Sequence, residues 1–266
     1  MVLTAYIQGV GILGPGLSDW TTAAEVLRGS SPYAAERTVL PAPAVLPPAE
    51  RRRAGRVIRL ALGVGAQAIA DAGVDARALP SVFSSSGGDG DNCHEICMTL
   101  ASRERLLSPT RFHNSVHNAA SGYWSIAYGC TEASTALCAH DASFGAGLIE
   151  ALSQLAQGPG ALLLVVYDVD YPPPMRWTRP IPDAFAIALL LARDEAVGAR
   201  RALAQLRLSI AQQPASSIAQ PELEQLRRDI PSARGLPLLE QLARRRSGCI
   251  ALDYLDEQRL RLELDL

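Results

Sequence analysis

The sequence contains no lysine, since all 25 basic residues are arginine, and they face 27 acidic residues at a formal net charge of −2. The absence of lysine excludes a lysine nucleophile and a Schiff-base mechanism. A charge balance so close to neutral gives no reason to expect a polyanion as partner. Histidine is scarce too: the chain has four, and none follows His140.

Long hydrophobic runs are also missing. The longest, at 160–166 and 184–191, are far shorter than the roughly 20 residues that a membrane-spanning helix needs. The N-terminus lacks the basic stretch and apolar core of a secretory signal. Five cysteines, an odd number at irregular positions, form no disulfide framework in a chain of this size. We therefore expect a cytoplasmic protein with reduced thiols.

What the sequence does contain is an alternation of strand and helix patterns. A chain of 266 residues that is 48% hydrophobic can bury one large core or two small ones. The apolar run at 161–166 is typical of a strand buried on both faces. Asp19 is placed to cap a helix, and Gly73 to end one. Alternating elements predict an α/β fold with helices on both sides of a sheet. We expect strands at 2–10, 81–85, 132–138, 161–166 and 185–192, and helices at 20–27, 51–72, 92–105, 118–128 and 142–155.

Residues 196–266 are richer in arginine, glutamine and glutamate than the rest of the chain. Here we expect helices at 199–212 and 237–246, separated by a polar loop, and a closing hairpin at 249–266 with its turn at 256–258. The composition divides the chain into a first domain, 1–195, and a C-terminal extension, 196–266.

The block from residue 108 to 151 contains a set of marked positions: Ser108, Pro109, Asn118, Gly122, Tyr128, Gly129, Asp141, Ser143 and Ala151. With these residues the block resembles the active-site region of the β-ketoacyl synthase family. Asn118 and Asp141 are 141 − 118 = 23 residues apart, which matches the family's spacing to its nucleophile. The stretch 8–11, Gln-Gly-Val-Gly, is similar to the family's opening strand, and the resemblance runs from about residue 2 to about 195. It implies a three-layer α/β domain equivalent to one half of the thiolase fold.

The resemblance places Asp141 where the family has its nucleophilic cysteine. That cysteine depends on the N-terminus of a helix, which favours the thiolate that takes the acyl chain. A carboxylate at this position can cap the helix, but it cannot hold an acyl thioester. Cys138 and His140 are the remaining catalytic candidates near this turn. We expect no catalytic residue in this chain and no activity by the chain alone.

The two histidines with which the family decarboxylates its malonyl unit lie in the second half of its fold, and this chain has no histidine there. The chain therefore resembles truncated chain-length-factor-like subunits of aryl-polyene and related type II polyketide systems. The resemblance implies a heterodimer with a β-ketoacyl-ACP synthase, whose acyl tunnel this chain would shape. Phe112 is the candidate for the end of that tunnel. The expected interface residues are Arg111, Phe112, His113, His117, Asn118, Tyr123 and Trp124.

Two other functions remain open: an active acyltransferase or decarboxylase that uses Cys138, His140 or Asp141, and a stand-alone acyl-chain binding module. The arginine run 51–53, with Arg56 and Arg59, is either a solvated helix face or a contact for an acidic acyl carrier protein. These alternatives require different partners and can be separated by co-purification.

We expect no metal and no cofactor. His113 and His117 are four residues apart, and His94 stands near Cys93 and Cys97, but no spacing matches a zinc site. The glycine-rich loop 87–91 could cradle phosphate or calcium, although a strand-to-helix turn fits it better because no lysine accompanies it. We interpret Asp168 and Asp170 as turn formers.

Overall fold

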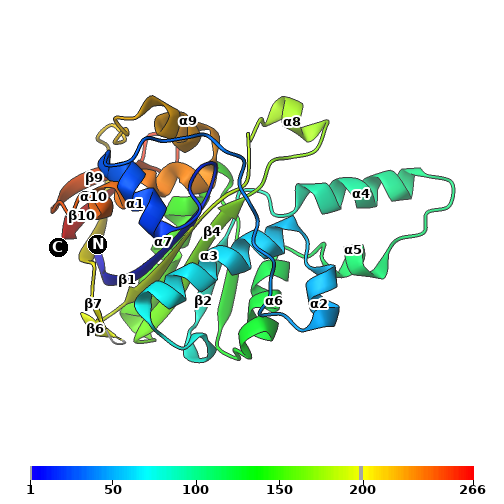
Figure 1. Cartoon of the computed structure of the whole chain (residues 1–266), viewed down its shortest axis with the longest axis horizontal. Helices are drawn as coiled ribbons and strands as arrows, with labels where there is room; N and C mark the ends of the chain where they lie inside the picture. The colour runs from blue at the N-terminus through cyan, green and yellow to red at the C-terminus, as the bar shows by residue number, and fades with distance from the viewer. Residues whose placement is uncertain (1, 198–199) are drawn as a thin grey trace.

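The computed structural model describes residues 2–197 and 200–266, and its centre is one eight-stranded sheet (Figure 1). The strand order is β3-β2-β4-β5-β1-β8-β10-β9. β2 pairs in parallel with β3 and β4, and the other neighbours are antiparallel. The strands are β1 (Leu3–Leu13), β2 (Ser81–Ser84), β3 (Ser134–Leu137), β4 (Ala161–Asp168), β5 (Phe185–Ala192), β8 (Ala204–Ala211), β9 (Gly248–Asp253) and β10 (Arg259–Asp265), with a separate pair β6 (Ala196–Val197) and β7 (Arg200–Arg201).

Helices cover both faces of the sheet, as the alternating pattern predicts. α3 (Arg56–Ala72) and α6 (Ala119–Tyr128) bury one core with one face of β4 and β5. α1 (Trp20–Arg28), α7 (Ser143–Gln157) and α10 (Leu236–Ala243) bury a second core on the other face. β5 is buried along its whole length, which explains its unbroken apolar sequence. The expected three-layer α/β fold is confirmed.

Close packing of α3 on β1 depends on glycine. A Cβ at Gly9 would overlap the carbonyl oxygen of Ala68, and one at Gly11 would overlap that of Val64. Only residues without a side chain let the helix backbone approach the strand so closely.

Several local predictions are confirmed. The Asp19 side chain accepts a hydrogen bond from the Thr22 amide at 2.9 Å and caps α1. Gly73 ends α3 in the left-handed conformation with φ of 68°. The strands expected at 81–85, 132–138, 161–166 and 185–192 match β2 to β5, and the closing hairpin is β9 and β10. The predicted 51–72 helix is instead two helices, because α2 (Pro48–Arg53) ends before Gly55 begins α3.

The helix predicted at 199–212 is wrong where the structure describes that segment, because residues 204–211 form strand β8. Ala204, Leu206 and Leu208 are buried at every second position, and β8 lies between β1 and β10. Pairing on both sides outweighed the helical propensity of a glutamine- and arginine-rich segment. The expected polar loop contains α9 (Pro221–Asp229), which starts with a proline and two acidic residues, as many helices do. Residues 198 and 199 lie outside the described chain.

The C-terminal strands continue the sheet that β1 begins. Their buried leucines belong to the same core cluster as those of β1, β5 and α7. The proposed division after residue 195 therefore separates two parts of one sheet. Among the described residues, no helix combines the length and the apolar character needed to cross a bilayer.

An arm projects from the body between β2 and α6 (Figure 1). It consists of α4 (Gly90–Ala101), a loop, and α5 (Pro109–His113). The short helix α8 (Met175–Thr178) lies near the base of the arm. The segment that leads into α8 packs closely against the start of α4, because a Cβ at Gly90 would overlap the ring of Tyr171. This arrangement places the arm, α6 and β3 on one side of the molecule.

Candidate functional site

The turn between β3 and α7 has the shape of a nucleophile elbow. It passes through a short 3₁₀ helix, η2 (His140–Ala142), and His140 adopts a φ of 49°, a conformation that few residues with a side chain adopt. The Ser143 hydroxyl donates to the His140 carbonyl at 2.7 Å and accepts from the Ala139 amide at 3.1 Å. The Ser84 hydroxyl donates to the Ser143 carbonyl at 2.7 Å, which ties the elbow to β2.

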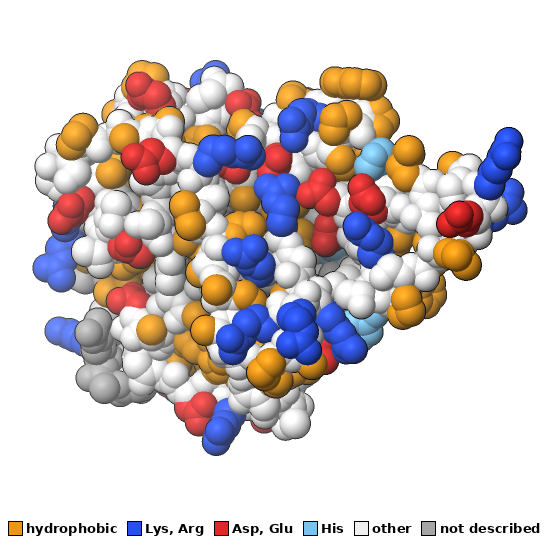
Figure 2. Space-filling model, turned by 45° about the vertical axis from the view of Figure 1, so that its right-hand side comes forward, with side chains coloured by type: hydrophobic (Ala, Val, Ile, Leu, Met, Phe, Trp, Pro, Cys, Tyr) orange, Lys and Arg blue, Asp and Glu red, His pale blue; other side chains and the backbone are white. Residues whose placement is uncertain are grey.

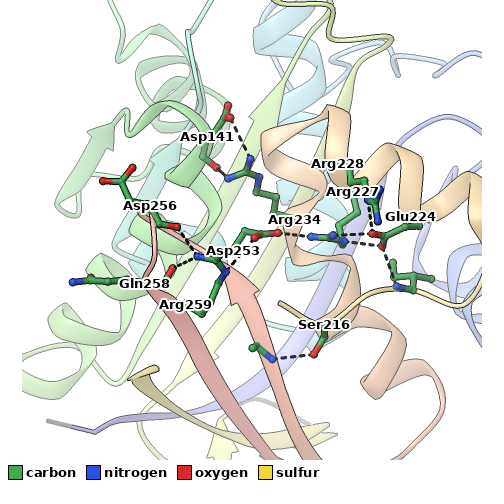
Figure 3. Close-up of polar contacts among 12 residues, drawn as sticks. Asp141, Ser216, Glu224, Arg227, Arg228, Arg234, Asp253, Asp256, Gln258 and Arg259 are labelled. Atoms are coloured by element: carbon green, nitrogen blue, oxygen red, sulfur yellow. Dashed lines mark hydrogen bonds and ion pairs between the residues drawn. The ribbon is translucent and has the colours of Figure 1, made fainter. Parts of the chain in front are cut away.

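Asp141 is held at this elbow by two arginines from distant parts of the chain. Arg179 donates to one carboxylate oxygen. Arg234 donates to the other at 3.2 Å and to the Asp141 carbonyl at 2.7 Å (Figure 3). Partial burial raises the pKa of the Asp141 carboxyl, but the Arg179 hydrogen bond and both guanidinium charges together hold it below its usual value. Asp141 is therefore a carboxylate engaged in ion pairs.

The prediction that Asp141 caps α7 is wrong. The residue that precedes α7 is Ala142, and no side chain caps this helix or η2. Arg179 and Arg234 direct the carboxylate away from the helix amides, because a charged hydrogen bond to guanidinium is stronger than one to a neutral amide.

Cys138 and His140 are both exposed, but they are not paired with one another. The Cys138 thiol donates to the Ser86 carbonyl at 3.1 Å. The Nε2 atom of His140 contacts the Arg179 guanidinium. Among the described residues no hydrogen bond joins this thiol to a base, so the elbow lacks the pairing that activates a cysteine nucleophile.

A second feature is an apolar groove on the surface of α5 and α6, with a volume of about 490 Å³. Phe112 is 67% exposed at its edge, and Tyr123 forms part of its wall. The Tyr123 hydroxyl donates to the Asn114 side chain at 3.2 Å, and Asn114 donates to the Arg53 carbonyl at 2.8 Å, so the wall is fixed. The groove is lined by Pro109, Phe112, His113, Val116, Asn118, Ala119, Gly122, Tyr123 and Ile126.

The structure brings four of the expected interface residues together in this groove: Phe112, His113, Asn118 and Tyr123. The other three lie elsewhere. Arg111 pairs with Glu95 at 3.4 Å on the arm. His117 places Nε2 3.0 Å from the Leu137 carbonyl and so ties the segment before α6 to the end of β3.

The prediction that Trp124 lies at the partner interface is wrong. Trp124 is fully buried, with its ring centroid 4.2 Å from that of Tyr128 and 6.2 Å from that of Phe83. The helical period of α6 turns Trp124 toward the sheet and leaves Gly122 and Ile126 facing outward. Trp124 is a core residue and does not belong to the exposed surface.

Several residues of the elbow and the groove are not indicated by the motifs in the sequence. Val116 and Ile126 line the groove as exposed apolar side chains, and Ile126 lies one helical turn from Gly122, a spacing that could have indicated a shared face. Arg179 and Arg234 are 38 and 93 residues from Asp141, and no local pattern indicated that they would meet it.

Asp168 and Asp170 are also more than turn formers. Asp168 is buried and accepts from the Ser86 amide, the Ser86 hydroxyl and the Ser232 amide at 2.6–2.8 Å. Burial raises the pKa of this carboxyl, although the same hydrogen bonds oppose that shift. Asp170 accepts from Arg56 and Arg176. These carboxylates hold loops together at the ends of the strands.

The 87–91 loop is the strand-to-helix turn that its sequence predicts. The Asp89 side chain accepts from the Asn92 amide at 3.0 Å and caps α4. In the part of the chain that the structure describes, no three histidine, cysteine or acidic side chains lie close enough to share a metal ion.

Comparison with known proteins agrees with this geometry. The family model for the β-ketoacyl synthase N-terminal domain matches residues 21–253, which is most of the chain. The chain belongs to this β-ketoacyl synthase family. The match continues beyond residue 195, where the resemblance seen in the sequence ended. No curated protein matches the chain.

Three solved structures share the fold of this family member over nearly the whole length of both chains. One is a ketosynthase, ApeO, in complex with its chain length factor, ApeC, from Xenorhabdus doucetiae, with 23% identity, a TM-score of 0.72, and coverage of 98% of this chain and 99% of that one. Another is the ishigamide ketosynthase/chain length factor, with 14% identity, a TM-score of 0.71 and 99% coverage of each chain. The third is AntDE:AntF, a type II polyketide synthase acyl-carrier protein in complex with its ketosynthase, with 12% identity, a TM-score of 0.72, and coverage of 100% and 99%.

Proposed function

We propose that this chain is a non-catalytic, chain-length-factor-like subunit that pairs in the cytoplasm with a β-ketoacyl-ACP synthase and shapes its acyl tunnel. The observation that carries this proposal is the location of exposed apolar side chains. Among the described residues, most of the large exposed hydrophobic side chains lie on the arm, α5, α6 and α8. Figure 2 shows hydrophobic side chains on the surface of the projecting arm. An apolar surface of this kind is typical of a protein interface. Its members are Met98, Leu100, Leu106, Phe112, Val116, Ile126, Met175 and Trp177.

The sheet edge beside this surface supports the same proposal. β3 is the last strand on that side and pairs only with β2 among the described residues. Ser134 is exposed, and the rest of β3 is half-buried. An uncovered edge strand next to an apolar groove offers both main-chain hydrogen-bonding groups and apolar area to a partner.

The elbow supports a non-catalytic role. Asp141 stands at the nucleophile position that the resemblance indicates, and its carboxylate is occupied by Arg179 and Arg234. We expect no covalent acyl adduct when the protein is incubated with acyl-carrier-protein thioesters and its intact mass is measured. A stoichiometric adduct on Cys138 or Cys130 would contradict this role.

The ketosynthase–chain length factor complexes among the similar structures agree with the proposal, because their chains have nearly the same length as this one. The AntDE:AntF complex also contains an acyl-carrier protein. We extend the proposal to an acyl carrier protein as a transient partner of α2, where Arg51, Arg52 and Arg53 are all exposed. Binding through these arginines should weaken as salt concentration rises.

Co-expression with a ketosynthase from the same organism tests the main proposal. We expect a stable heterodimer with the wild-type chain. Ile126→Arg should reduce its yield by roughly tenfold or more, because a charge would be buried against apolar area. Ile210→Arg is the matched control, since Ile210 is 56% exposed on β8, away from the proposed surface. Equal loss with both variants, or no complex with the wild type, would contradict the proposal.

A further inference from the structure

A second pocket lies apart from the elbow and the groove. It is formed by the loop after α1, the segment before β5 and the first turns of α9, and its volume is about 520 Å³. Small-molecule sites commonly have volumes of about 300–1,000 Å³. The lining residues are Pro15, Tyr33, Ala35, Glu36, Arg37, Pro182, Asp183, Pro221, Glu222, Gln225 and Leu226.

The walls of this pocket are apolar and preformed. The Tyr33 hydroxyl donates to the Pro15 carbonyl at 2.9 Å, which fixes the aromatic ring. The Glu36 carbonyl accepts from the Gly16 amide at 2.8 Å, and the Asp183 side chain accepts from the Thr38 amide at 2.9 Å. These bonds join the loop after α1 to the end of β1 and to the segment before β5, so this part of the wall is in place before any ligand arrives.

The charge around the pocket is predominantly negative. Arg37 is the only basic residue in the lining, and its guanidinium lies 3.6 Å from the Asp183 carboxylate. Glu36 and Glu222 have no ion pair, and their carboxylates accept no hydrogen bond, among the described residues. Burial raises the pKa of Tyr33, and the negative charges of Glu222 and Asp183 raise it further. These two carboxylates therefore contribute a negative potential at the Tyr33 hydroxyl.

We propose that this pocket binds a small organic cation with a flat apolar body, such as an aryl amidine or an aryl ammonium ion. The apolar part would lie against Tyr33 and the three prolines, and the cation would face the carboxylates of Glu36 and Glu222. Neutral or anionic ligands of the same shape could make the apolar contacts but would lack the attraction to the two carboxylates. The site shares no lining residue with the groove and does not depend on the proposed role in a heterodimer.

Benzamidine is a suitable probe, with benzamide as the neutral analogue and benzoate as the anionic one. Titration of the full chain, followed by ligand-observed NMR and calorimetry, should give a saturable Kd of about 1–10 mM for benzamidine, the affinity expected for a ligand of roughly nine heavy atoms. Benzamide should bind roughly tenfold more weakly. Benzoate should show no saturable binding.

Variants of the chain separate the pocket from general surface attraction. Glu36→Gln with Glu222→Gln should weaken benzamidine binding by roughly tenfold, while Glu257→Gln, an exposed acidic residue in the hairpin turn, should leave it unchanged. Ala35→Trp should block binding although both carboxylates remain. Thermal unfolding of each variant verifies that it is folded. Equal affinity for benzamidine and benzamide, unchanged affinity in the double variant or in Ala35→Trp, or no saturable benzamidine binding would overturn the proposal.

Discussion

The two edges of the sheet differ in whether other parts of the chain cover them. At the β9 edge, the chain covers itself, since the Ser216 amide donates to the Ala251 carbonyl at 2.8 Å. The Ser216 hydroxyl also accepts from the Ala251 amide at 3.0 Å, the contact drawn at Ser216 in Figure 3. At the β3 edge, no described strand or loop pairs with the outer side of the strand. Because proteins normally protect exposed edges, the difference indicates that the chain completes one edge alone and leaves the other to a partner.

A polar network strengthens the covered edge. Arg227, which is 8% exposed in its side chain, pairs with Glu224 on α9 and with Asp253 on β9 (Figure 3). Arg259 on β10 lies 3.4 Å from the other oxygen of Asp253. The network holds α9 against the hairpin, and it predicts that changes here affect the stability of the single chain, while changes at the open edge affect assembly.

Arg227→Ala should have the largest effect at the covered edge. Removing this guanidinium leaves Glu224 and Asp253 without their buried partner, which should lower the free energy of unfolding by about 3–5 kcal/mol. Denaturant unfolding of the isolated chain measures the loss. Arg261→Ala is the control, because Arg261 pairs with Glu263 on the exposed face of β10 and should change stability by less than about 1 kcal/mol. Similar losses in both variants would show that the network does not strengthen this edge.

The second prediction concerns pH. The Arg227 hydrogen bond, the main cause, lowers the pKa of Glu224 to about 2, and its side chain is only 12% exposed. A carboxyl with a lowered pKa stabilises the fold above its unfolded pKa of 4.5 and loses that stabilisation as pH falls toward 2. Glu224→Gln should therefore cost on the order of 2–3 kcal/mol at pH 7 and progressively less between about pH 4.5 and 2. A pH-independent loss would contradict this assignment.

The third prediction concerns Phe112 in the apolar groove near the open β3 edge. Phe112→Ala should change the unfolding free energy of the isolated chain by less than about 0.5 kcal/mol, because the ring is 67% exposed. The same change should weaken heterodimer association by about 2 kcal/mol and allow the reconstituted complex to make longer acyl chains. Unfolding, heterodimer yield and product length are measured together.

Trp124→Ala serves as the contrast to Phe112→Ala. This buried side chain should cost the isolated chain about 3–5 kcal/mol, with no specific effect on product length. An intact Phe112→Ala complex with an unchanged product distribution would leave only a scaffolding role for the groove.

Asp141→Ala should have a small effect on both stability and assembly. Because the carboxylate is 44% exposed, its pairs with Arg179 and Arg234 should contribute only about 0.5–1 kcal/mol at neutral pH. The lowered pKa means that this contribution is present above about pH 4 and is lost as the carboxyl is protonated at lower pH. Product formation by the heterodimer should be largely retained. Loss of product with unchanged stability would assign Asp141 a chemical role.

The features that depend on neighbouring residues could be predicted from the sequence. Periodic apolar positions predicted the alternation of strands and helices, Asp19 and Gly73 predicted the ends of helices, and the 118–141 spacing indicated the family. These signals are local because hydrogen bonds and side-chain periods repeat over a few residues.

Contacts between distant parts of the chain could not be predicted in this way, because they depend on how the elements pack together. Residues 204–211 became a strand because β1 and β10 supply hydrogen-bonding partners on both sides. Trp124 became a core residue because α6 faces the sheet, and Asp141 became an ion-pair partner because the fold brings Arg179 and Arg234 to it. Pairing and burial of this kind depend on groups that are distant in the chain, whose energies exceed the small local preferences that a sequence pattern reflects.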